Sequence, residues 1–206
     1  MKYKVLIVED QEMPRQLLEI FIERSESFEH MASVSDASLS VEWCRSRRPD
    51  LILMDVLTEG EMSGLDAAAE IKKESPQIRI IMITSMPEYS WLDRAKACGI
   101  DSFWYKETRE ETILSVMERT MKGERVWPDA PPEVRLGLAR SGEFTERELD
   151  VLRELLTGDS NSDIGERLGI SASTVKTHVQ HMLEKTGFKT RTELASVARS
   201  LGLVIK

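Results

Sequence analysis

Several short apolar runs in the first half of this chain are each followed directly by residues with a charged or hydroxyl side chain. They supply three carboxylates, one hydroxyl and one ammonium group: Glu9, Asp10, Asp55, Thr84 and Lys106. Close carboxylates raise one another's pKa or recruit a cation, and an oxygen-only set suits Mg²⁺. With that charge balanced, an Asp carboxylate can attack phosphorus, and a hydroxyl and an ammonium group can share the charge of the acyl phosphate formed. We therefore expect Asp55 to be the nucleophile.

The elements that must position these residues form a regular alternation. Apolar strand-like runs at 3–8, 30–35, 51–54, 80–83 and 103–105 alternate with amphipathic stretches at 13–26, 38–47, 65–74, 87–97 and 109–122. This pattern predicts an α/β fold, a doubly wound five-stranded parallel sheet with helices on both faces. Such sheets carry their sites beyond the carboxyl ends of the strands, so the five polar groups are expected to meet in one crevice.

The pattern changes after residue 122. Residues 123–142 contain Trp127-Pro128 and Pro131-Pro132 and lose the strand-helix rhythm, which is typical of an interdomain linker with at most one short helix. Beyond it, capping boxes at Thr145 and Thr190 and caps at Ser160 and Ser171 predict four helices. The predicted domains are 1–122 and a smaller all-α domain, 143–206.

Length and composition agree with two domains. The 206 residues carry a net charge of −8, with 16 Lys and Arg against 23 Asp and Glu in residues 1–122. Residues 171–199 carry a local charge of +3, so we expect one basic face. The two cysteines have no metal-like spacing, and no apolar run approaches the roughly 20 residues of a membrane span. A cytoplasmic protein without a membrane partner is expected.

The predicted helix after Ser171 has two distinct faces. Its apolar positions recur at three- and four-residue spacing, whereas the opposite face is small and polar. A short helix, a turn at Gly169 and this second helix match helix-turn-helix geometry, in which the second helix enters the major groove of double-stranded DNA. The candidate DNA contacts are Ser171, Ser173, Thr174, Lys176, Thr177 and Gln180.

Residues 1–122 resemble a bacterial response-regulator receiver domain, because all five polar positions are filled in the family's order. The resemblance implies phosphorylation at Asp55, Mg²⁺ as cofactor held by Glu9, Asp10, Asp55 and the backbone carbonyl of Leu57, and a phosphate switch of Thr84, Lys106 and Phe103. Phe103 would be the aromatic that turns inward on phosphorylation. The loop 56–64 departs from the family pattern, reaching its Gly one residue late, and Phe103 replaces the common Tyr.

Residues 143–206 resemble the LuxR-type DNA-binding domain, and the whole chain resembles the NarL/FixJ-family response regulators. The matching residues include Thr145-Glu146-Arg147-Glu148, Thr174-Val175-Lys176 and Arg191-Thr192. The resemblance implies a sensor histidine kinase as partner, base-edge contacts at Lys176, Thr177 and Gln180, and a homodimer in the phosphorylated or DNA-bound state. It also implies that the chain is not an enzyme.

Two alternatives remain open at this point. Phosphatases of the haloacid dehalogenase kind also use an Asp nucleophile and Mg²⁺. They resemble one another in having a second Asp two residues after the nucleophile, and this chain has Leu57 at that position. The other alternative is a constitutive DNA-binding protein whose receiver-like half only dimerises.

Overall fold

A computed structural model describes residues 2–88, 90–106 and 111–204. The described residues divide into two compact units: 86–88 and 131–204 belong to the second and the rest to the first, so the last crossing point lies between Ala130 and Pro131. This point falls inside the predicted linker 123–142. The first unit contains the sheet and the second contains the four C-terminal helices, and each has its own apolar core.

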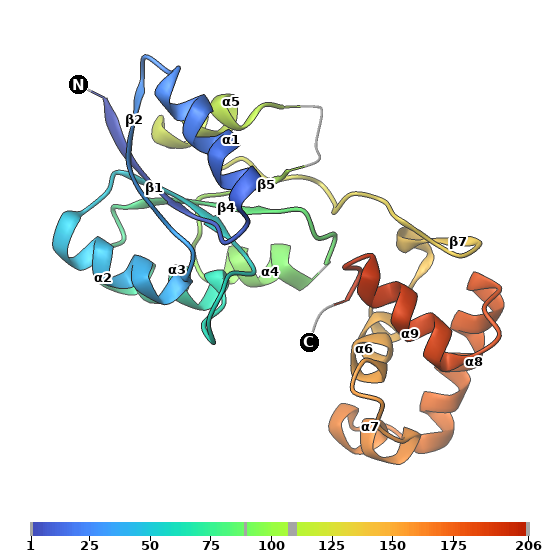
Figure 1. Ribbon diagram of the computed structural model, residues 1–206. Coiled ribbons are helices and arrows are strands. Elements are labelled where there is room, and N and C mark those ends of the chain that lie inside the picture. The colour runs from blue at the N-terminus through green and yellow to red at the C-terminus, as the bar shows by residue number, and fades with distance from the viewer. Residues whose placement is uncertain (1, 89, 107–110, 205–206) are drawn as a thin grey trace. The chain divides into compact units, whose positions relative to one another are not determined.

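The first unit is built on a five-stranded parallel sheet in the order β2-β1-β3-β4-β5 (Figure 1). Every residue of the central strand is buried, as expected for a sheet covered on both faces. The predicted doubly wound parallel sheet is therefore confirmed. The strands are β1 (Tyr3–Val8), β2 (Phe28–Val34), β3 (Leu51–Asp55), β4 (Arg79–Thr84) and β5 (Ser102–Tyr105).

Within the described residues, five helices cover this sheet, α1 and α5 on one face and α2, α3 and α4 on the other (Figure 1). Local capping fixes where several of them begin, since the side chains of Asp36, Ser63 and Thr112 each accept a backbone N–H of the first turn. The predicted start of the last helix at 109 lies outside the described residues. The helices are α1 (Glu12–Glu23), α2 (Ala37–Arg47), α3 (Gly64–Glu74), α4 (Ser90–Ala97) and α5 (Ile113–Met121).

The second unit holds the four predicted helices around a core of aliphatic side chains. Thr145 and Glu148 form the predicted capping box. The second predicted box is only half present: Thr190 caps its helix, but the Glu193 carboxylate accepts the backbone N–H of Lys189 instead of that of Thr190. The helices are α6 (Glu146–Leu155), α7 (Asn161–Leu168), α8 (Ala172–Thr186) and α9 (Arg191–Ser200).

The predicted linker contains a β-hairpin that the sequence pattern did not reveal. Strands β6 (Arg135–Leu136) and β7 (Ala139–Arg140) pair antiparallel around Gly137, whose φ of 64° suits a two-residue hairpin turn. One turn of 3₁₀ helix, η1 (Ser141–Glu143), follows. The hairpin was missed because each strand has only two residues, too few for a periodic signal.

Across the described residues, every helix is too short or too polar to cross a lipid bilayer.

Candidate functional site

The carboxyl ends of four neighbouring strands bring the predicted polar residues to one edge of the sheet. Asp55 and Thr84 are the last residues of β3 and β4, Lys106 directly follows β5, and Glu9 and Asp10 directly follow β1. The parallel registers keep these strand ends level with one another, so residues separated by up to about a hundred positions in sequence become neighbours.

Lys106 links the two buried carboxylates of this crevice. Its Nζ atom donates to Asp55 Oδ2 at 2.6 Å and to Glu9 Oε2 at 2.5 Å. Glu9 is fully buried, Asp55 is 4% exposed, and the Lys106 side chain is 13% exposed. Because the three groups are shielded from water, the attraction of Lys106 to each carboxylate is stronger than that of a surface ion pair.

The surroundings of Asp55 favour its protonated form, or a cation that balances the negative charge of its carboxylate. Burial raises the pKa of Asp55 to about 7, an effect that outweighs the stabilisation of its charge by Lys106 and is reinforced by the negative charge of Glu9. For Lys106, burial opposes the charged form, yet the attraction of Asp55 and Glu9 raises its pKa. One ammonium group therefore serves two carboxylates, which leaves excess negative charge in the crevice.

Asp10 adds a third carboxylate to this excess. One oxygen from each of Glu9, Asp10 and Asp55 lies within 4.8 Å of the other two. The Asp10 Oδ1 atom is buried and has no hydrogen-bond partner, an arrangement that costs free energy unless a cation or water binds it. A cluster of carboxylate oxygens with one unpaired acceptor has the donor chemistry that a hard divalent cation requires. The residues present therefore fit such an ion.

A glycine that the sequence analysis did not assign to the site supports the position of Asp55. A Cβ on Gly64 would lie 1.8 Å from the backbone oxygen of Asp55, so a side chain there would force the strand end away. The loop between them is held in place as well: Glu59 N–H donates to the Ser35 carbonyl at 3.2 Å, and Leu57 N–H donates to Asp55 Oδ1 at 3.3 Å. The sequence shows only that this Gly comes late in the atypical loop 56–64, and its contact with the Asp55 carbonyl appears in the fold alone.

The remaining predicted receiver residues lie on or beside the strand ends. Thr84 is 1% exposed, at the end of the strand next to Asp55. Phe103 is also 1% exposed, with its ring centroid 5.1 Å from that of Tyr105 and 6.3 Å from that of Trp127. The predicted inward turn of Phe103 on phosphorylation stays a prediction. The Leu57 backbone carbonyl also remains a predicted ligand.

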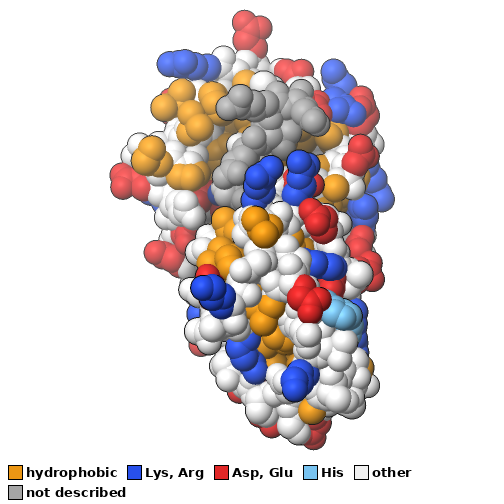
Figure 2. All heavy atoms as spheres, turned by 90° about the vertical axis from the view of Figure 1, so that its right-hand side faces the viewer, with side chains coloured by type: hydrophobic (Ala, Val, Ile, Leu, Met, Phe, Trp, Pro, Cys, Tyr) orange, Lys and Arg blue, Asp and Glu red, His pale blue; other side chains and the backbone are white. Residues whose placement is uncertain are grey.

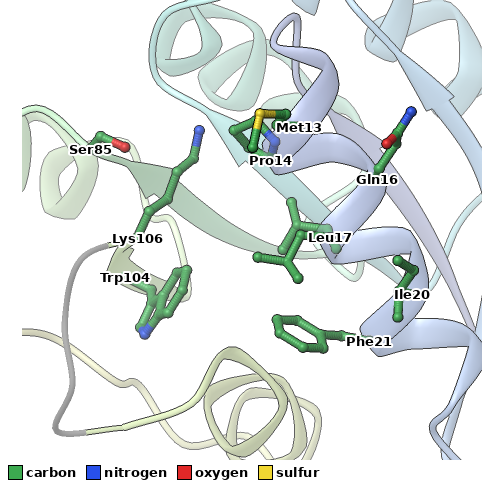
Figure 3. Close-up of a pocket in the computed structure, with 10 residues that line it drawn as sticks. Met13, Pro14, Gln16, Leu17, Ile20, Phe21, Ser85, Trp104 and Lys106 are labelled. Carbon is green, nitrogen blue, oxygen red and sulfur yellow. The ribbon is translucent and has the colours of Figure 1, made fainter.

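An apolar pocket opens beside Lys106. It has a volume of about 470 Å³ and lies between α1 and the end of β5, with Leu17 and Phe21 facing Trp104 across it (Figure 3). Several apolar side chains at its rim are exposed, Met13 at 82% among them. Exposed apolar residues gathered on one helix face are typical of a protein contact surface.

Helix α8 carries the other predicted site. The apolar residues Val175, Val179 and Met182 are buried in the core of the second unit. All six predicted DNA contacts are exposed on the remaining surface: Ser171, Ser173, Thr174, Lys176, Thr177 and Gln180. The Ser171 hydroxyl caps the helix by accepting the Thr174 N–H at 3.1 Å.

The turn before α8 is unusually tight. Gly169 adopts φ 64°, and a Cβ on Gly165 would lie 2.6 Å from the Ile170 carbonyl oxygen. Gly165 therefore lets α7 approach the start of α8 closely. This is the compact geometry of a helix-turn-helix, and it fixes the exposed face of α8 relative to α7.

The expected basic face is less basic than the sequence count suggested. Three of the five basic residues in 171–199 are used internally: Lys185 pairs with Glu148 at 2.7 Å, and Arg191 and Arg199 donate to backbone carbonyls. On the face drawn in Figure 2, Lys and Arg side chains are interspersed with Asp and Glu. The Glu148 carboxylate therefore offsets the charge of Lys185, whereas Arg191 and Arg199 keep their positive charge.

Comparisons with known proteins decide the family. The model of the response regulator receiver domain matches residues 5–118, and that of the bacterial regulatory proteins of the luxR family matches residues 143–198. The chain is a response regulator. It is 34% identical to the response regulator protein VraR of Staphylococcus epidermidis, over 99% of this chain and 100% of VraR. The Staphylococcus aureus VraR is 33% identical over the same shares.

Solved structures agree on the fold of this response regulator. A structure of two RcsB dimers bound to two parallel DNAs matches with a TM-score of 0.66 and 16% identity, covering 98% of this chain and 100% of RcsB. RcsB from Salmonella enterica serovar Typhimurium, bound to promoter rprA in the presence of BeF₃⁻, matches with a TM-score of 0.62 and 17% identity over 97% and 99%. The chain thus combines a receiver domain with a LuxR-type DNA-binding domain, and its family is not typically one of enzymes.

Proposed function

We propose that this response regulator is switched by phosphorylation of Asp55, which controls sequence-specific DNA binding by α8 and thereby transcription. The observation that carries the proposal is the buried convergence of Asp55, Glu9 and Lys106 with the unpaired oxygen of Asp10. This arrangement presents a carboxylate nucleophile beside a fixed ammonium group, with excess negative charge that a cation would balance.

In the proposed transfer, an Asp55 carboxylate oxygen attacks the phosphorus atom of a phosphohistidine or a small acyl phosphate. The new bond is Oδ–P, the bond that breaks joins phosphorus to the donor nitrogen or oxygen, and the donor leaves with that electron pair. Lys106, whose Nζ lies 2.6 Å from Asp55 Oδ2, is the proposed partner of a phosphoryl oxygen once Asp55 is phosphorylated. Thr84, at the end of the neighbouring strand, is the proposed hydroxyl donor to another phosphoryl oxygen.

Mg²⁺ is the proposed cofactor, and when bound it would neutralise charge on the transferring group. Glu9, Asp10, Asp55 and the Leu57 carbonyl would hold it. Because Glu9 already accepts from Lys106 in the present arrangement, Asp10 is the carboxylate with the most unused acceptor capacity. Among the four, Asp10 is therefore the one whose oxygen is free for the ion, whereas Glu9 would also orient Lys106.

The proposed partners are a sensor histidine kinase and double-stranded DNA, in a cytoplasmic location. The apolar pocket on α1 supports a protein donor, because it lies beside Lys106 and therefore close to the acceptor carboxylate. On α8, Lys176, Thr177 and Gln180 are the proposed base-edge contacts. A homodimer is proposed for the phosphorylated or DNA-bound state, since two linked recognition helices gain affinity through effective concentration.

Mass-spectrometric mapping tests the central residue. The full chain is incubated with acetyl phosphate and Mg²⁺, and stable derivatives of the acyl phosphate are mapped in the wild type, in Asp55→Asn and in the matched control Asp50→Asn. Asp50 precedes β3 at its opposite end, where its carboxylate accepts the Lys4 N–H. We expect one phosphoryl group on Asp55 in the wild type and in Asp50→Asn, and none in Asp55→Asn. Unchanged labelling of Asp55→Asn would overturn the assignment.

A further inference from the structure

The segment that follows α5 does not leave the first unit at once. Gly123, with φ 90°, reverses the chain after the helix, and its N–H donates to the Thr120 carbonyl. The turn is fastened by Arg119, whose Nε donates to the Glu124 carboxylate at 2.7 Å. The beginning of the predicted linker is therefore directed back along the sheet.

Val126 then binds the outer edge of β5. The Phe103 N–H donates to the Val126 carbonyl at 2.9 Å, and the Val126 N–H donates to Ser102 Oγ at 3.1 Å. The Ser102 hydroxyl is itself buried and lies 2.7 Å from Thr120 Oγ1. Because backbone groups of Phe103 and Val126 are joined directly, this part of the linker follows the position of the β5 backbone.

The Trp127 ring lies next to the Phe103 ring of β5. Its centroid lies 6.3 Å from that of Phe103 with a tilt of 30°, and Lys96 Nζ of α4 lies 5.6 Å from the same centroid. Aromatic pairs at this distance and a cation near an indole are both attractive contacts. The ring thus joins three parts of the receiver: the β5 aromatic, α4 and the start of the linker.

A cavity beside this contact gives the rings room to rearrange. It has a volume of about 520 Å³ and is lined by Phe103 and Tyr105 of β5, Thr112 and Val116 near and on α5, and Trp127. A packed core resists side-chain movement, whereas a ring next to open volume can change rotamer without displacing other core atoms.

From this geometry we propose that Trp127 is a positioning residue that transmits the state of Phe103 to the interdomain linker. The proposal rests on the proposed function, together with the prediction from the sequence that Phe103 turns inward when Asp55 is phosphorylated. When the Phe103 ring moves, Trp127 loses its contact with that ring, and the segment from Val126 to Ala130 binds β5 differently. The linker then carries the signal in its own conformation, in addition to any change on the receiver surface.

Fluorine NMR of the full chain labelled with 5-fluorotryptophan tests the first step. The Trp127 resonance is assigned with Trp127→Phe, and Trp43, whose ring lies near Arg47 on α2, serves as the internal control. On phosphorylation with acetyl phosphate and Mg²⁺, we expect the Trp127 resonance to shift and that of Trp43 to stay. In Phe103→Leu the Trp127 shift should disappear although Asp55 is still phosphorylated. A Trp127 resonance that never responds to phosphorylated Asp55 would overturn the inference.

DNA binding tests the second step. A target sequence is first selected in vitro with the phosphorylated wild type. Trp127→Ala should reduce the phosphorylation-dependent gain in affinity about fivefold or more, the lower end of usual coupling between sites, whereas Trp43→Ala should retain it. Trp127→Phe should restore most of the gain, because an aromatic ring remains against Phe103.

The phosphoryl content of Asp55, measured by intact mass in each sample, separates the two hypotheses. Full phosphorylation with an unchanged gain in Trp127→Ala overturns the role of Trp127 and leaves the proposed function standing. No phosphoryl group on wild-type Asp55 overturns the proposed function, and the inference falls with it.

Discussion

The receiver pocket, which is the crevice around Asp55, and the recognition helix α8 differ in how their functional residues come together. The pocket joins charged groups from the ends of three strands, with Glu9 and Lys106 almost a hundred positions apart. The proposed DNA contacts lie within ten positions of one another on α8, and all are exposed. In the pocket, substitutions should therefore alter stability, pH dependence and chemistry together. On α8, they should alter binding while leaving the fold intact.

The largest expected difference comes from removing one lysine in each region. Lys106→Met leaves two buried carboxylates without their cation, and removal of one partner of a buried pair costs about 3 kcal/mol of unfolding free energy. Lys176→Met removes an exposed side chain, so its change should stay within about 0.5 kcal/mol. Urea unfolding in metal-free buffer measures both. Equal stability of the two variants would remove the distinction between the regions.

A pH titration sharpens the same comparison. The pKa of Asp55 is about 7 in the folded state against 3.8 as its ordinary value, so the folded state binds the proton more tightly. Stability from this group is complete below pH 3.8 and is lost as the pH rises through 7. We expect a metal-free loss of about 1 to 2 kcal/mol across this window, after allowing for coupling to Lys106 and Glu9.

Asp55→Asn is the control for that titration, because an amide cannot ionise. Its unfolding free energy should vary less between pH 4 and 8 than that of the wild type, and it should exceed the wild-type value at pH 8. A wild-type curve that rises over the same window would contradict the charge balance described for the crevice.

On α8 the expected effects concern DNA binding alone. Thr177→Ala should weaken binding to a selected site by about 1 to 2 kcal/mol and relax the preference at one base pair, as expected for a base-edge contact. Ser162→Ala, on α7, changes a hydroxyl outside the predicted contact set and is the matched control. Fluorescence anisotropy with the selected site and with single-base variants measures both. A uniform loss on every sequence would assign Thr177 to a phosphate instead.

The smallest effect is expected at the apolar pocket on α1. Leu17 is 50% exposed at this pocket. Leu17→Glu should slow phosphotransfer from the partner kinase about fivefold, equivalent to about 1 kcal/mol, because it weakens a protein contact. Transfer from acetyl phosphate should be unchanged, because a small donor does not need the pocket. Equal slowing with both donors would instead point to damage at Asp55.

The sequence was informative wherever local pattern and strand order together determine position. The strand ends at Asp55 and Thr84 follow from apolar runs, and the helix starts at Thr145 and Ser171 follow from capping residues, so both sites could be placed on their elements. The pattern also sufficed to expect the five pocket residues at one edge of the sheet, because parallel strands align their carboxyl ends.

What the sequence could not reveal depends on contacts between distant segments. The role of Gly64 appears only when the Asp55 carbonyl lies against it, and the contact of Trp127 with Phe103 requires the linker to bind the edge of β5. The charge count could not include the pairing of Lys185 with Glu148 from another helix for the same reason. In each case the missing information is which side chain meets which backbone or partner in the folded chain.

The central claim is that occupation of Asp55 changes the affinity of α8 for DNA. Titration of a selected DNA site with wild type and Asp55→Ala, each with and without acetyl phosphate and Mg²⁺, tests it most directly. We predict that the phosphodonor tightens binding by the wild type and leaves Asp55→Ala unchanged. Equal affinities of both proteins under both conditions, with wild-type Asp55 shown to be phosphorylated, would contradict it.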